Sequence, residues 1–246
     1  MPKQKKTQST RVIEDNIKVA ILIDGGFYRR RAYAVFGDKS PVDRAEELDQ
    51  YCRRHLKERI NGIDHNHALY RIFYYDCPPS DKTVYDPISK KLIDLSKSDL
   101  YSWTNEFLEE LKKHRKFAIR LGELTEAGTE YYLPPKQTRA VISGKLLPEN
   151  IKSSDLRLMI QQKGVDMRIG LDIASMAFKK QVDQIILISG DSDFVPAAKL
   201  ARREGIDFVL DPLGATIREN LKEHIDGLKV ADSAYITDSK KQIKAK

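Results

Sequence analysis

The sequence predicts an α/β domain with a central, mostly parallel sheet, and two observations carry this prediction. Short apolar runs typical of strands buried on both faces, such as residues 19–23 (VAILI) and 185–188 (IILI), alternate with longer segments of helical periodicity. A chain of 246 residues is also long enough to bury a substantial core in one domain. Strands that alternate with helices indicate a parallel sheet with helices on its faces.

Each element is expected from its local pattern. The expected strands cover residues 19–23, 68–75, 117–121, 184–188, 208–210 and 234–237. A first helix is expected to follow the Gly25-Gly26 pair, and further helices cover residues 41–60, 100–114, about 163–180, about 194–204 and 217–224. Residues 76–98 and 128–154 are rich in Pro, Ser, Asp or Gly without a sustained period, so we expect two loop insertions there. The polar residues 64–67 are expected to form a loop before the second strand.

The formal net charge of +7 is concentrated at the ends of the chain. Residues 1–16 contribute +2 and residues 238–246 contribute +3, so only +2 remains for the rest. We expect a basic disordered tail over residues 1–16, a domain over residues 17–237 and a second basic tail over residues 238–246. Such tails add salt-sensitive affinity for phosphates, so the charge permits a polyanionic partner without demonstrating one.

Membrane, secretory and disulfide classes have no support in the sequence. The longest apolar runs are far too short to span a bilayer, and the N-terminal residues lack the apolar stretch of a secretory signal. The two cysteines, Cys52 and Cys77, lie far apart without a CxxC partner, which indicates neither a zinc site nor a disulfide framework. The cytoplasm is the expected location.

Carboxylates stand at the ends of two predicted strands, where ligands usually bind. Asp24 ends the first strand, and Asp191 and Asp193 follow the strand at residues 184–188 in the stretch ILISGDSDF. One Asp there would be explained as a helix N-cap, but a cap does not explain both. Because ligands of parallel sheets bind at the carboxyl ends of the strands, residues distant in the sequence are expected to meet at this edge.

The helix near residues 163–180 supplies further acidic candidates. On a helical wheel Asp166 shares the apolar face with Ile169 and Ile173, and Asp172 borders that face. A buried carboxylate is costly unless a cation or hydrogen bonds compensate. Several Asp without His or Cys form a hard oxygen site suited to Mg²⁺ or Mn²⁺, and such a site supports attack of an activated water on a phosphodiester.

Three segments together resemble a known family. VAILIDGGFY, KGVDMRIGLDIA and ILISGDSDFVPAAKLARREG occur in the order found in the NYN domain family, the LabA-like branch of the PIN-like nucleases, and YYDCPPSDK with IDLSKSDLYSW resembles members as well. The resemblance covers roughly residues 18–237. It implies a three-layer α/β/α PIN-like (Rossmannoid) domain with metal-dependent ribonuclease activity. Carried onto matching positions, the implied acidic set is Asp24, Asp166, Asp191 and Asp193, with Asp172 as a fifth candidate.

The residues have different expected roles. Asp24 and Asp191 are expected to bind the ion directly, Asp166 to bind it or orient a water, and Asp193 to act through water or cap the next helix. Asp172 is a ligand or a structural carboxylate. The candidates for contact with RNA are Gly25, Gly26, Lys163 and Arg29, the last together with its neighbours Arg30 and Arg31; the alternatives are a tight turn for the glycines and solvent-facing charge for the others.

The leading functional hypothesis is a Mg²⁺- or Mn²⁺-dependent endoribonuclease that cuts single-stranded or loop RNA. A DxD-type phosphatase is less favoured, because Ser189 and Gly190 separate Asp191 from its strand. A binding module that keeps the fold and recognises RNA or protein without turnover is the third hypothesis. Related small nucleases often pair to build a longer groove, so a homodimer is a candidate assembly.

Overall fold

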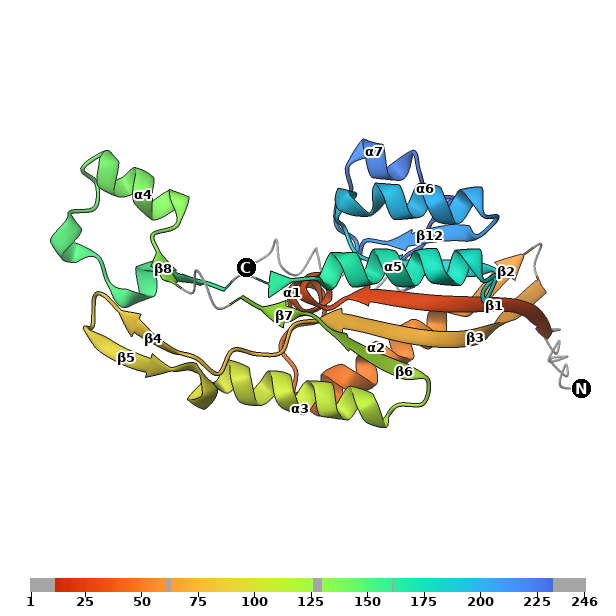
Figure 1. Cartoon of the computed structure of the whole chain (residues 1–246), viewed down its shortest axis with the longest axis horizontal. Coiled ribbons are helices and arrows are strands. Elements are labelled where there is room, and N and C mark those ends of the chain that lie inside the picture. The colour runs from red at the N-terminus through yellow and green to blue at the C-terminus, as the bar shows by residue number, and fades with distance from the viewer. Residues whose placement is uncertain (1–11, 61–62, 126–129, 161, 232–246) are drawn as a thin grey trace, which may run out of the picture.

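A central sheet organises the computed structural model, which describes residues 12–60, 63–125, 130–160 and 162–231. Within these residues, the main sheet consists of β1 (Val12–Asp24), β2 (Lys57–Ile60), β3 (Ile63–Asp76), β6 (Phe117–Leu121), β11 (Gln184–Ile188), β12 (Asp207–Asp211) and β13 (Gly227–Leu228). The order is β13-β12-β11-β1-β3-β2, and β6 pairs with the C-terminal part of β3 (Figure 1). Only the β2–β3 pairing is antiparallel among these strands, so the mostly parallel sheet is confirmed.

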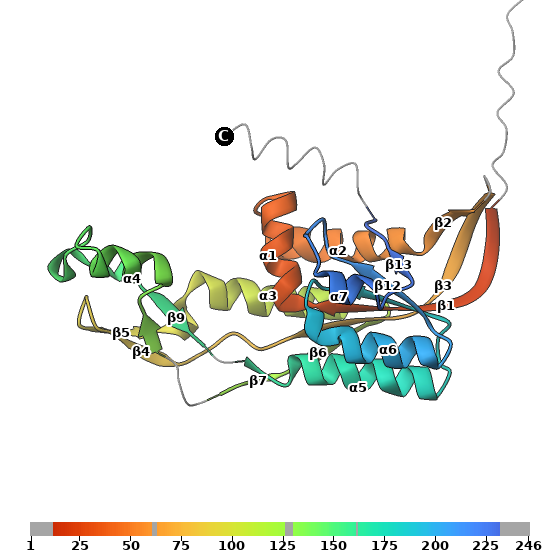
Figure 2. The same cartoon turned by 90° about the horizontal axis from the view of Figure 1, so that it is seen from above.

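Helices cover both faces of the sheet. On one face lie α1 (Gly25–Phe36), α2 (Pro41–His55) and α3 (Asp99–Lys113), and on the other α5 (Val165–Phe178), α6 (Val195–Arg203) and the short α7 (Glu219–Lys222) (Figure 2). Strand β1 shows why: Ile21 and Ile23 pack toward the first group, whereas Ala20 and Leu22 pack toward the second. This is the expected three-layer α/β/α arrangement. None of the helices in the described ranges is long and apolar enough to cross a bilayer.

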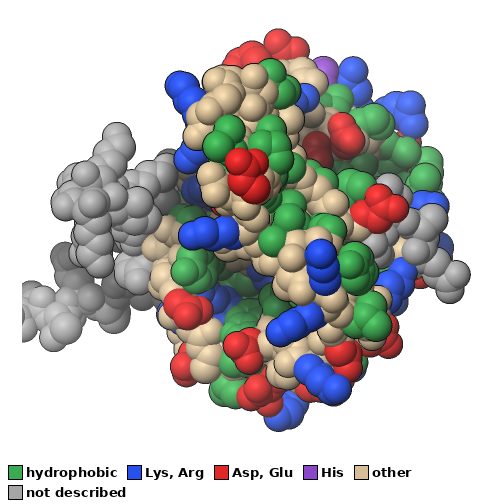
Figure 3. Space-filling model, turned by 90° about the vertical axis from the view of Figure 1, so that its left-hand side faces the viewer, with side chains coloured by type: hydrophobic (Ala, Val, Ile, Leu, Met, Phe, Trp, Pro, Cys, Tyr) green, Lys and Arg blue, Asp and Glu red, His purple; other side chains and the backbone are tan. Residues whose placement is uncertain are grey.

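An arm extends beyond the carboxyl ends of the parallel strands (Figures 1 and 2). We use "the arm" for β4 (Thr83–Asp86), β5 (Lys91–Asp94), β8 (Glu130–Tyr132), α4 (Pro135–Ile142) and β9 (Arg157–Met159), in which β4 pairs with β5 and β8 with β9. Its base is closed by an antiparallel pair, β7 (Glu123–Leu124) with β10 (Gln162–Lys163). Viewed from the end that carries the arm, Lys and Arg side chains border a hollow, with Asp and Glu among them (Figure 3).

The two predicted loop insertions are therefore partly regular structure. The segment 76–98 contains the β4–β5 hairpin and the 3₁₀ turn Leu95–Lys97, and the segment 128–154 contains β8, α4 and two further 3₁₀ turns. In the hairpin, Asp86 Oδ1 accepts hydrogen bonds from the amides of Ile88 and Ser89, so the Asp-Pro sequence makes the connecting turn. Strands of three or four residues are too short for periodicity to identify.

The polar edge of the sheet also differs from the prediction. Strand β1 begins at Val12, inside the segment expected to be a tail, and residues 64–67, expected to be a loop, belong to β3. The predicted helix 41–60 ends at His55, and residues 57–60 form β2. These strand ends pair with one another beyond the helices, so their side chains lack the apolar pattern that marks a strand. The expected strand 234–237 and the tail 238–246 lie outside the described residues.

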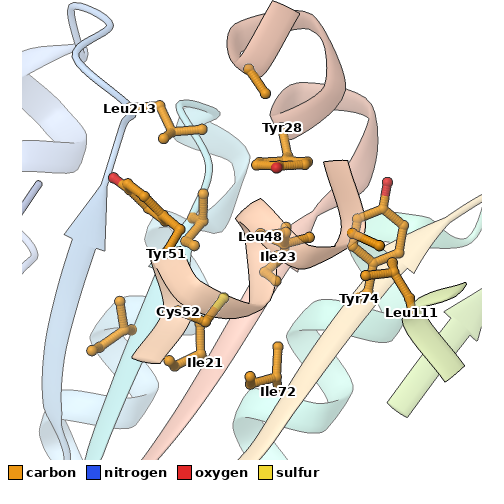
Figure 4. Packing of buried hydrophobic residues seen from close by; sticks show 14 of the residues in the cluster. Ile21, Ile23, Tyr28, Leu48, Tyr51, Cys52, Ile72, Tyr74, Leu111 and Leu213 are labelled. Atoms are coloured by element: carbon orange, nitrogen blue, oxygen red, sulfur yellow. The ribbon is translucent and has the colours of Figure 1, made fainter. Parts of the chain in front are cut away.

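The core beneath α1, α2 and α3 contains a buried polar network centred on a carboxylate. Asp211, at the end of β12, accepts a hydrogen bond of 2.5 Å from Tyr51 Oη, and its Oδ2 lies 2.8 Å from His55 Nε2. The amide of Leu213 donates to the other carboxylate oxygen over 2.8 Å. Figure 4 shows Tyr51 and Leu213 among the apolar side chains of this cluster. The network fixes α2 to the end of β12, because a buried carboxylate without these partners would be strongly destabilising.

The turn from β1 into α1 depends on Gly25. A Cβ at this position would lie 2.6 Å from the Tyr74 ring and from the backbone oxygen of Tyr75 on β3. A Cβ at Gly26 would have its nearest neighbour 3.6 Å away, at Asp24 Oδ1, which is ordinary contact distance. Gly25 is thus required by close packing of α1 against β3, whereas Gly26 is not.

The two glycines form a matched pair for a stability experiment. Gly25→Ala is expected to lower the free energy of unfolding by about 1–3 kcal/mol, because the neighbouring backbone must shift. Gly26→Ala should stay within about 0.5 kcal/mol of the wild type. Urea denaturation of both variants measures the difference, and equal stabilities would contradict the packing role of Gly25.

Candidate functional site

Asp24 is held at the carboxyl end of β1 by two hydrogen bonds. The parallel register of β1 and β11 sets Ile23 opposite Ile188, so Asp24 lies beside Ser189. The Ser189 hydroxyl donates to Asp24 Oδ2 over 3.2 Å, and the Phe27 amide donates to Oδ1 over 3.0 Å. Asp24 is therefore the N-cap of α1 and, at the same time, a half-buried carboxylate at the edge of the sheet.

Asp191 and Asp193 occupy the loop after β11, and both side chains are exposed. Asp191 Oδ1 accepts from the amide of Asp193 over 3.0 Å, and its own amide donates to Ser189 Oγ over 3.3 Å. Asp191 thereby caps the 3₁₀ turn η4 (Ser192–Phe194) that leads into α6. Of the two roles expected for Asp193, action through water or capping of the next helix, the capping role belongs instead to Asp191.

Asp166 lies in the first turn of α5 and is exposed. The expectation that it sits on the buried face is wrong in one respect. Ile169 and Ile173 are fully buried, but Asp166 precedes Ile169 by nearly one turn, where the helix extends past the packed core. It projects from the same edge of the sheet at which Asp24 and Asp191 stand.

Mutual repulsion shows that these carboxylates form one electrostatic group. Burial raises the pKa of the Asp24 carboxyl above its ordinary value against the lowering effect of its hydrogen bonds, and the charge of Asp166 raises it further. Partial desolvation and the charges of Asp191 and Asp193 raise the pKa of Asp166. We call Asp24, Asp166, Asp191 and Asp193 the acidic set. The structure brings these four predicted residues together.

Asp172 stands apart from the acidic set. Its Oδ2 accepts a 2.7 Å hydrogen bond from Tyr75 Oη on β3 and lies 3.3 Å from Arg120 Nε on β6. Burial and the neighbouring Asp172 carboxylate raise the pKa of Tyr75, which keeps the phenol a donor. Of the two roles considered for Asp172, these contacts favour the structural one.

Three residues predicted to contact RNA, Arg29, Gly25 and Lys163, have different neighbours from those expected. Arg29 binds the buried Asp76 at the end of β3, with Nη2 3.0 Å from Oδ1 and Nε 3.0 Å from Oδ2. Gly25 is closed off by β3, as described above. Lys163 is exposed in β10 at the base of the arm, paired with Glu123 in the strand register rather than at the start of a helix.

A cleft beside the acidic set contains Arg30, one of the arginines expected to contact RNA, and Arg218, which was not among the predicted site residues. It encloses about 310 Å³ and is lined by Asp24, Asp191, Arg30 and Arg218 among others. Arg30 lowers the pKa of Asp24 through its charge, and Arg218 Nη1 donates to Ser192 Oγ over 3.2 Å. Arg30 lies one helical turn after Gly26 and so projects from the same side of α1. This spacing could have indicated that Arg30, rather than Arg29, faces the acidic set. Arg218 lies in a loop far along the chain, and no local pattern marks it.

The chemistry of the acidic set fits a hard divalent cation. All four donors are carboxylates, and the repulsion among them would be relieved by a positive ion. Within the part of the chain that the structure describes, no three His, Cys, Asp or Glu side chains are placed to hold one ion together. Mg²⁺ is usually bound through only one or two carboxylates, with waters and substrate phosphate completing its shell. Asp24 and Asp191 would hold such an ion.

The fold and the site together define a class of protein. A three-layer α/β/α domain with carboxylates gathered at the carboxyl edge of a mostly parallel sheet has the PIN-like fold. The sequence model of the NYN domain matches residues 93–224, more than half of the 246-residue chain. The chain therefore belongs to the NYN domain family, which lies within the PIN-like nuclease superfamily. The matched region contains Asp166, Asp191 and Asp193 but not Asp24, whose place in the set depends on the geometry.

Other comparisons add little detail. No curated protein matches the sequence. A crystal structure of a protein of unknown function from Vibrio parahaemolyticus RIMD 2210633 is similar with a TM-score of 0.44 and 14% sequence identity. The similarity covers 87% of this chain and 91% of that chain.

The raised pKa of Asp24 predicts how stability of the metal-free protein depends on pH. From the ordinary value of 3.8 up to the raised pKa, the folded state holds more protons than the unfolded state, so stability falls as pH rises through this window. At neutral pH the buried charge is at its most costly. Asp24→Asn is therefore expected to raise the melting temperature in EDTA at pH 7, with a gain that shrinks toward pH 4.

Asp172→Asn is the matched control, because it changes a carboxylate outside the acidic set that is paired with an arginine. It should lower stability at pH 7 by about 1 kcal/mol through weaker contacts with Tyr75 and Arg120. Thermal unfolding followed by circular dichroism measures both variants. A lower melting temperature for Asp24→Asn at pH 7 would mean that the bonds from Phe27 and Ser189 outweigh the cost of burial.

Proposed function

We propose that the protein is a metal-dependent endoribonuclease that hydrolyses phosphodiester bonds in single-stranded or loop RNA with Mg²⁺ or Mn²⁺. The observation that carries the proposal is the meeting of Asp24, Asp166, Asp191 and Asp193 at one edge of the sheet, with Arg30 and Arg218 in the adjoining cleft. Membership of the NYN domain family supports the same chemistry.

The surroundings of each carboxylate indicate its role in the reaction. Asp24 is oriented by Phe27 and Ser189 and so offers a fixed carboxylate, whereas the exposed Asp191 is oriented by the amide of Asp193. A bound Mg²⁺ or Mn²⁺ supplies an activated water and neutralises charge on the phosphate. Asp166 accepts a proton more readily than an ordinary Asp, because partial burial and the charges of Asp191 and Asp193 raise its pKa.

Arginines and the arm provide contacts for the RNA backbone. Arg30 and Arg218 line the same cleft as Asp24, where their guanidinium groups can receive a phosphate beside the carboxylates. The arm extends from this edge of the sheet, and basic side chains border the hollow on that face (Figure 3). A strand of RNA that reaches the acidic set from this side would pass between the arm and α1. The arm is where we place substrate choice, since binding loops stand on rigid scaffolds.

Cleavage assays with substituted carboxylates test the proposal. Asp24→Asn and Asp191→Asn are each expected to reduce the rate of cleavage of a fluorescent oligoribonucleotide in Mn²⁺ by more than about 100-fold, beyond the loss typical of groups that only orient metal ligands. Asp172→Asn, a carboxylate on α5 outside the acidic set, should retain activity within about 10-fold. Unchanged cleavage in both site variants would contradict the proposal.

The same experiment distinguishes the competing hypothesis of a binding module without turnover. The nuclease should lose activity in EDTA and regain it when Mg²⁺ or Mn²⁺ is added. Binding of the oligoribonucleotide in EDTA, together with no cleavage by wild-type protein in Mn²⁺, would favour the module.

The role of Arg218 is tested by the salt dependence of RNA binding. Removing one phosphate contact lowers the slope of log affinity against log salt by about 0.7 for a single strand. Arg218→Gln is therefore expected to bind more weakly and with a shallower slope, measured by fluorescence anisotropy over a range of KCl concentrations. Arg203→Gln, an exposed change on α6 outside the cleft, should leave the slope unchanged.

A further inference from the structure

An apolar groove runs between α5 and α6 directly beside the acidic set. It encloses about 440 Å³, and Asp166 and Asp193 form its rim at one end. Met167 and Leu171 line it from α5, and Leu200 lines it from α6. The groove and the acidic set therefore share two carboxylates, so a molecule in the groove lies against any ion or phosphate held at the edge of the sheet.

The groove exposes large apolar side chains of the kind that normally pack in a protein core. Met167 is 68% exposed and Leu171 is 61% exposed, although Ile169 and Ile173 on the same helix are completely buried. Met167 and Leu171 are one turn apart, so they form one surface rather than two isolated residues. A contiguous exposed apolar surface next to polar groups is typical of a binding site.

Gly170 keeps this groove open. A Cβ at Gly170 would meet no atom within 4 Å, and its φ is not among the positive values that favour glycine. Neither close packing nor backbone conformation therefore requires glycine here, although glycine inside a helix lowers the folding equilibrium constant by about two- to fivefold relative to alanine. Any larger side chain at this position would enter the space between the helices.

We infer that this groove binds the nucleobase of the nucleotide next to the phosphate held at the acidic set. The inference rests on the proposed function and adds a subsite to it. A base presents two flat apolar faces. One can lie against Leu171 and the thioether of Met167 on α5, and the other faces Leu200 on α6. Apart from the two rim carboxylates, the side chains of the described lining residues carry no O–H or N–H group. The subsite therefore holds any base by its faces and does not read its edges.

The rim carboxylates favour a nucleotide over an apolar protein partner. A protein surface that covered the groove would bury the ionisable side chains of Asp166 and Asp193, and burial of a carboxylate without a cation is costly. A nucleotide places its phosphate and the accompanying divalent ion at that end and leaves the apolar end to its base. The acidic end of the groove then contacts the divalent ion and the phosphate, and the apolar end contacts the base.

Abasic substrates test the subsite without changing the protein. The probe is a fluorescein-labelled oligoribonucleotide that the wild-type protein cleaves at one bond, compared with two copies that carry a single abasic ribonucleotide immediately 5′ or 3′ of that bond. One of the two abasic copies is expected to lower kcat/KM by about 10-fold, the order of magnitude for one stacked base. Equal cleavage of all three substrates would overturn the inference and leave the ribonuclease proposal intact.

Gly170→Leu tests the same subsite from the side of the protein, with Gly170→Ala as the matched control. The leucine fills the groove and is expected to reproduce the 10-fold loss on intact RNA, with no further loss on the abasic copy, because both changes remove one contact. The alanine should cleave like wild type. Mn²⁺ binding should be unchanged in both variants and neither should unfold at a lower temperature than wild type, since replacing a helical glycine favours the folded state. An additive loss of cleavage would overturn the inference.

Two further outcomes are informative. A change in oligomeric state of Gly170→Leu, measured by light scattering, would overturn the inference and identify the groove as an interface between copies of this chain. If wild-type protein neither cleaves nor binds the oligoribonucleotide in Mn²⁺, the proposed function itself fails. That result is distinct from equal cleavage of the intact and the two abasic substrates, which would contradict only the subsite.

Discussion

The register between β1 and β11 is the constraint on which the site depends. It sets Ile23 opposite Ile188, so the first polar residues after the two strands, Asp24 and Ser189, meet in a hydrogen bond. Both strands are completely buried over the paired region, and a slip of one residue would turn every apolar side chain to the wrong face. The apolar core thus fixes the position of a carboxylate that is itself unfavourable to bury. Burial of the apolar strands stabilises the sheet, whereas repulsion among the carboxylates destabilises this edge of it. The apolar core outweighs the repulsion.

Much of this arrangement could be predicted from the sequence because its signals are strong and local. Residues 19–23 of β1 and 185–188 of β11 are continuous apolar runs. Asp24 ends the first strand, and Asp191 follows the second after Ser189 and Gly190, so the topology of a parallel sheet predicted that both lie at one edge. Asp166 was found through helical periodicity, which gave the correct side of α5 but not the extent of the core. Periodicity describes direction around a helix and contains no information about where the neighbouring layer ends.

Other features depend on partners distant in the sequence. Arg29 and Arg30 are adjacent and chemically identical, yet Arg29 binds the buried Asp76 whereas Arg30 faces Asp24. Asp211 also ends a strand at the same edge and would have been an equally good metal candidate by position, but Tyr51 and His55 enclose it in the core. The helices that cover the sheet determine which strand-end carboxylates remain available. That choice is made by tertiary packing, so a local pattern cannot reveal it.

The short pairing of β7 with β10 has a consequence for how this family can diversify. Because Glu123 stands opposite Lys163, the chain leaves the domain at Leu124 and returns to it at Gln162, at neighbouring points. A segment with adjacent ends can be lengthened, shortened or exchanged at a small entropic cost and without moving the strands below it. Asp166 lies four residues after this return point. Evolution can therefore replace the part of the arm that contains β8, α4 and β9 while inheriting the carboxylates unchanged.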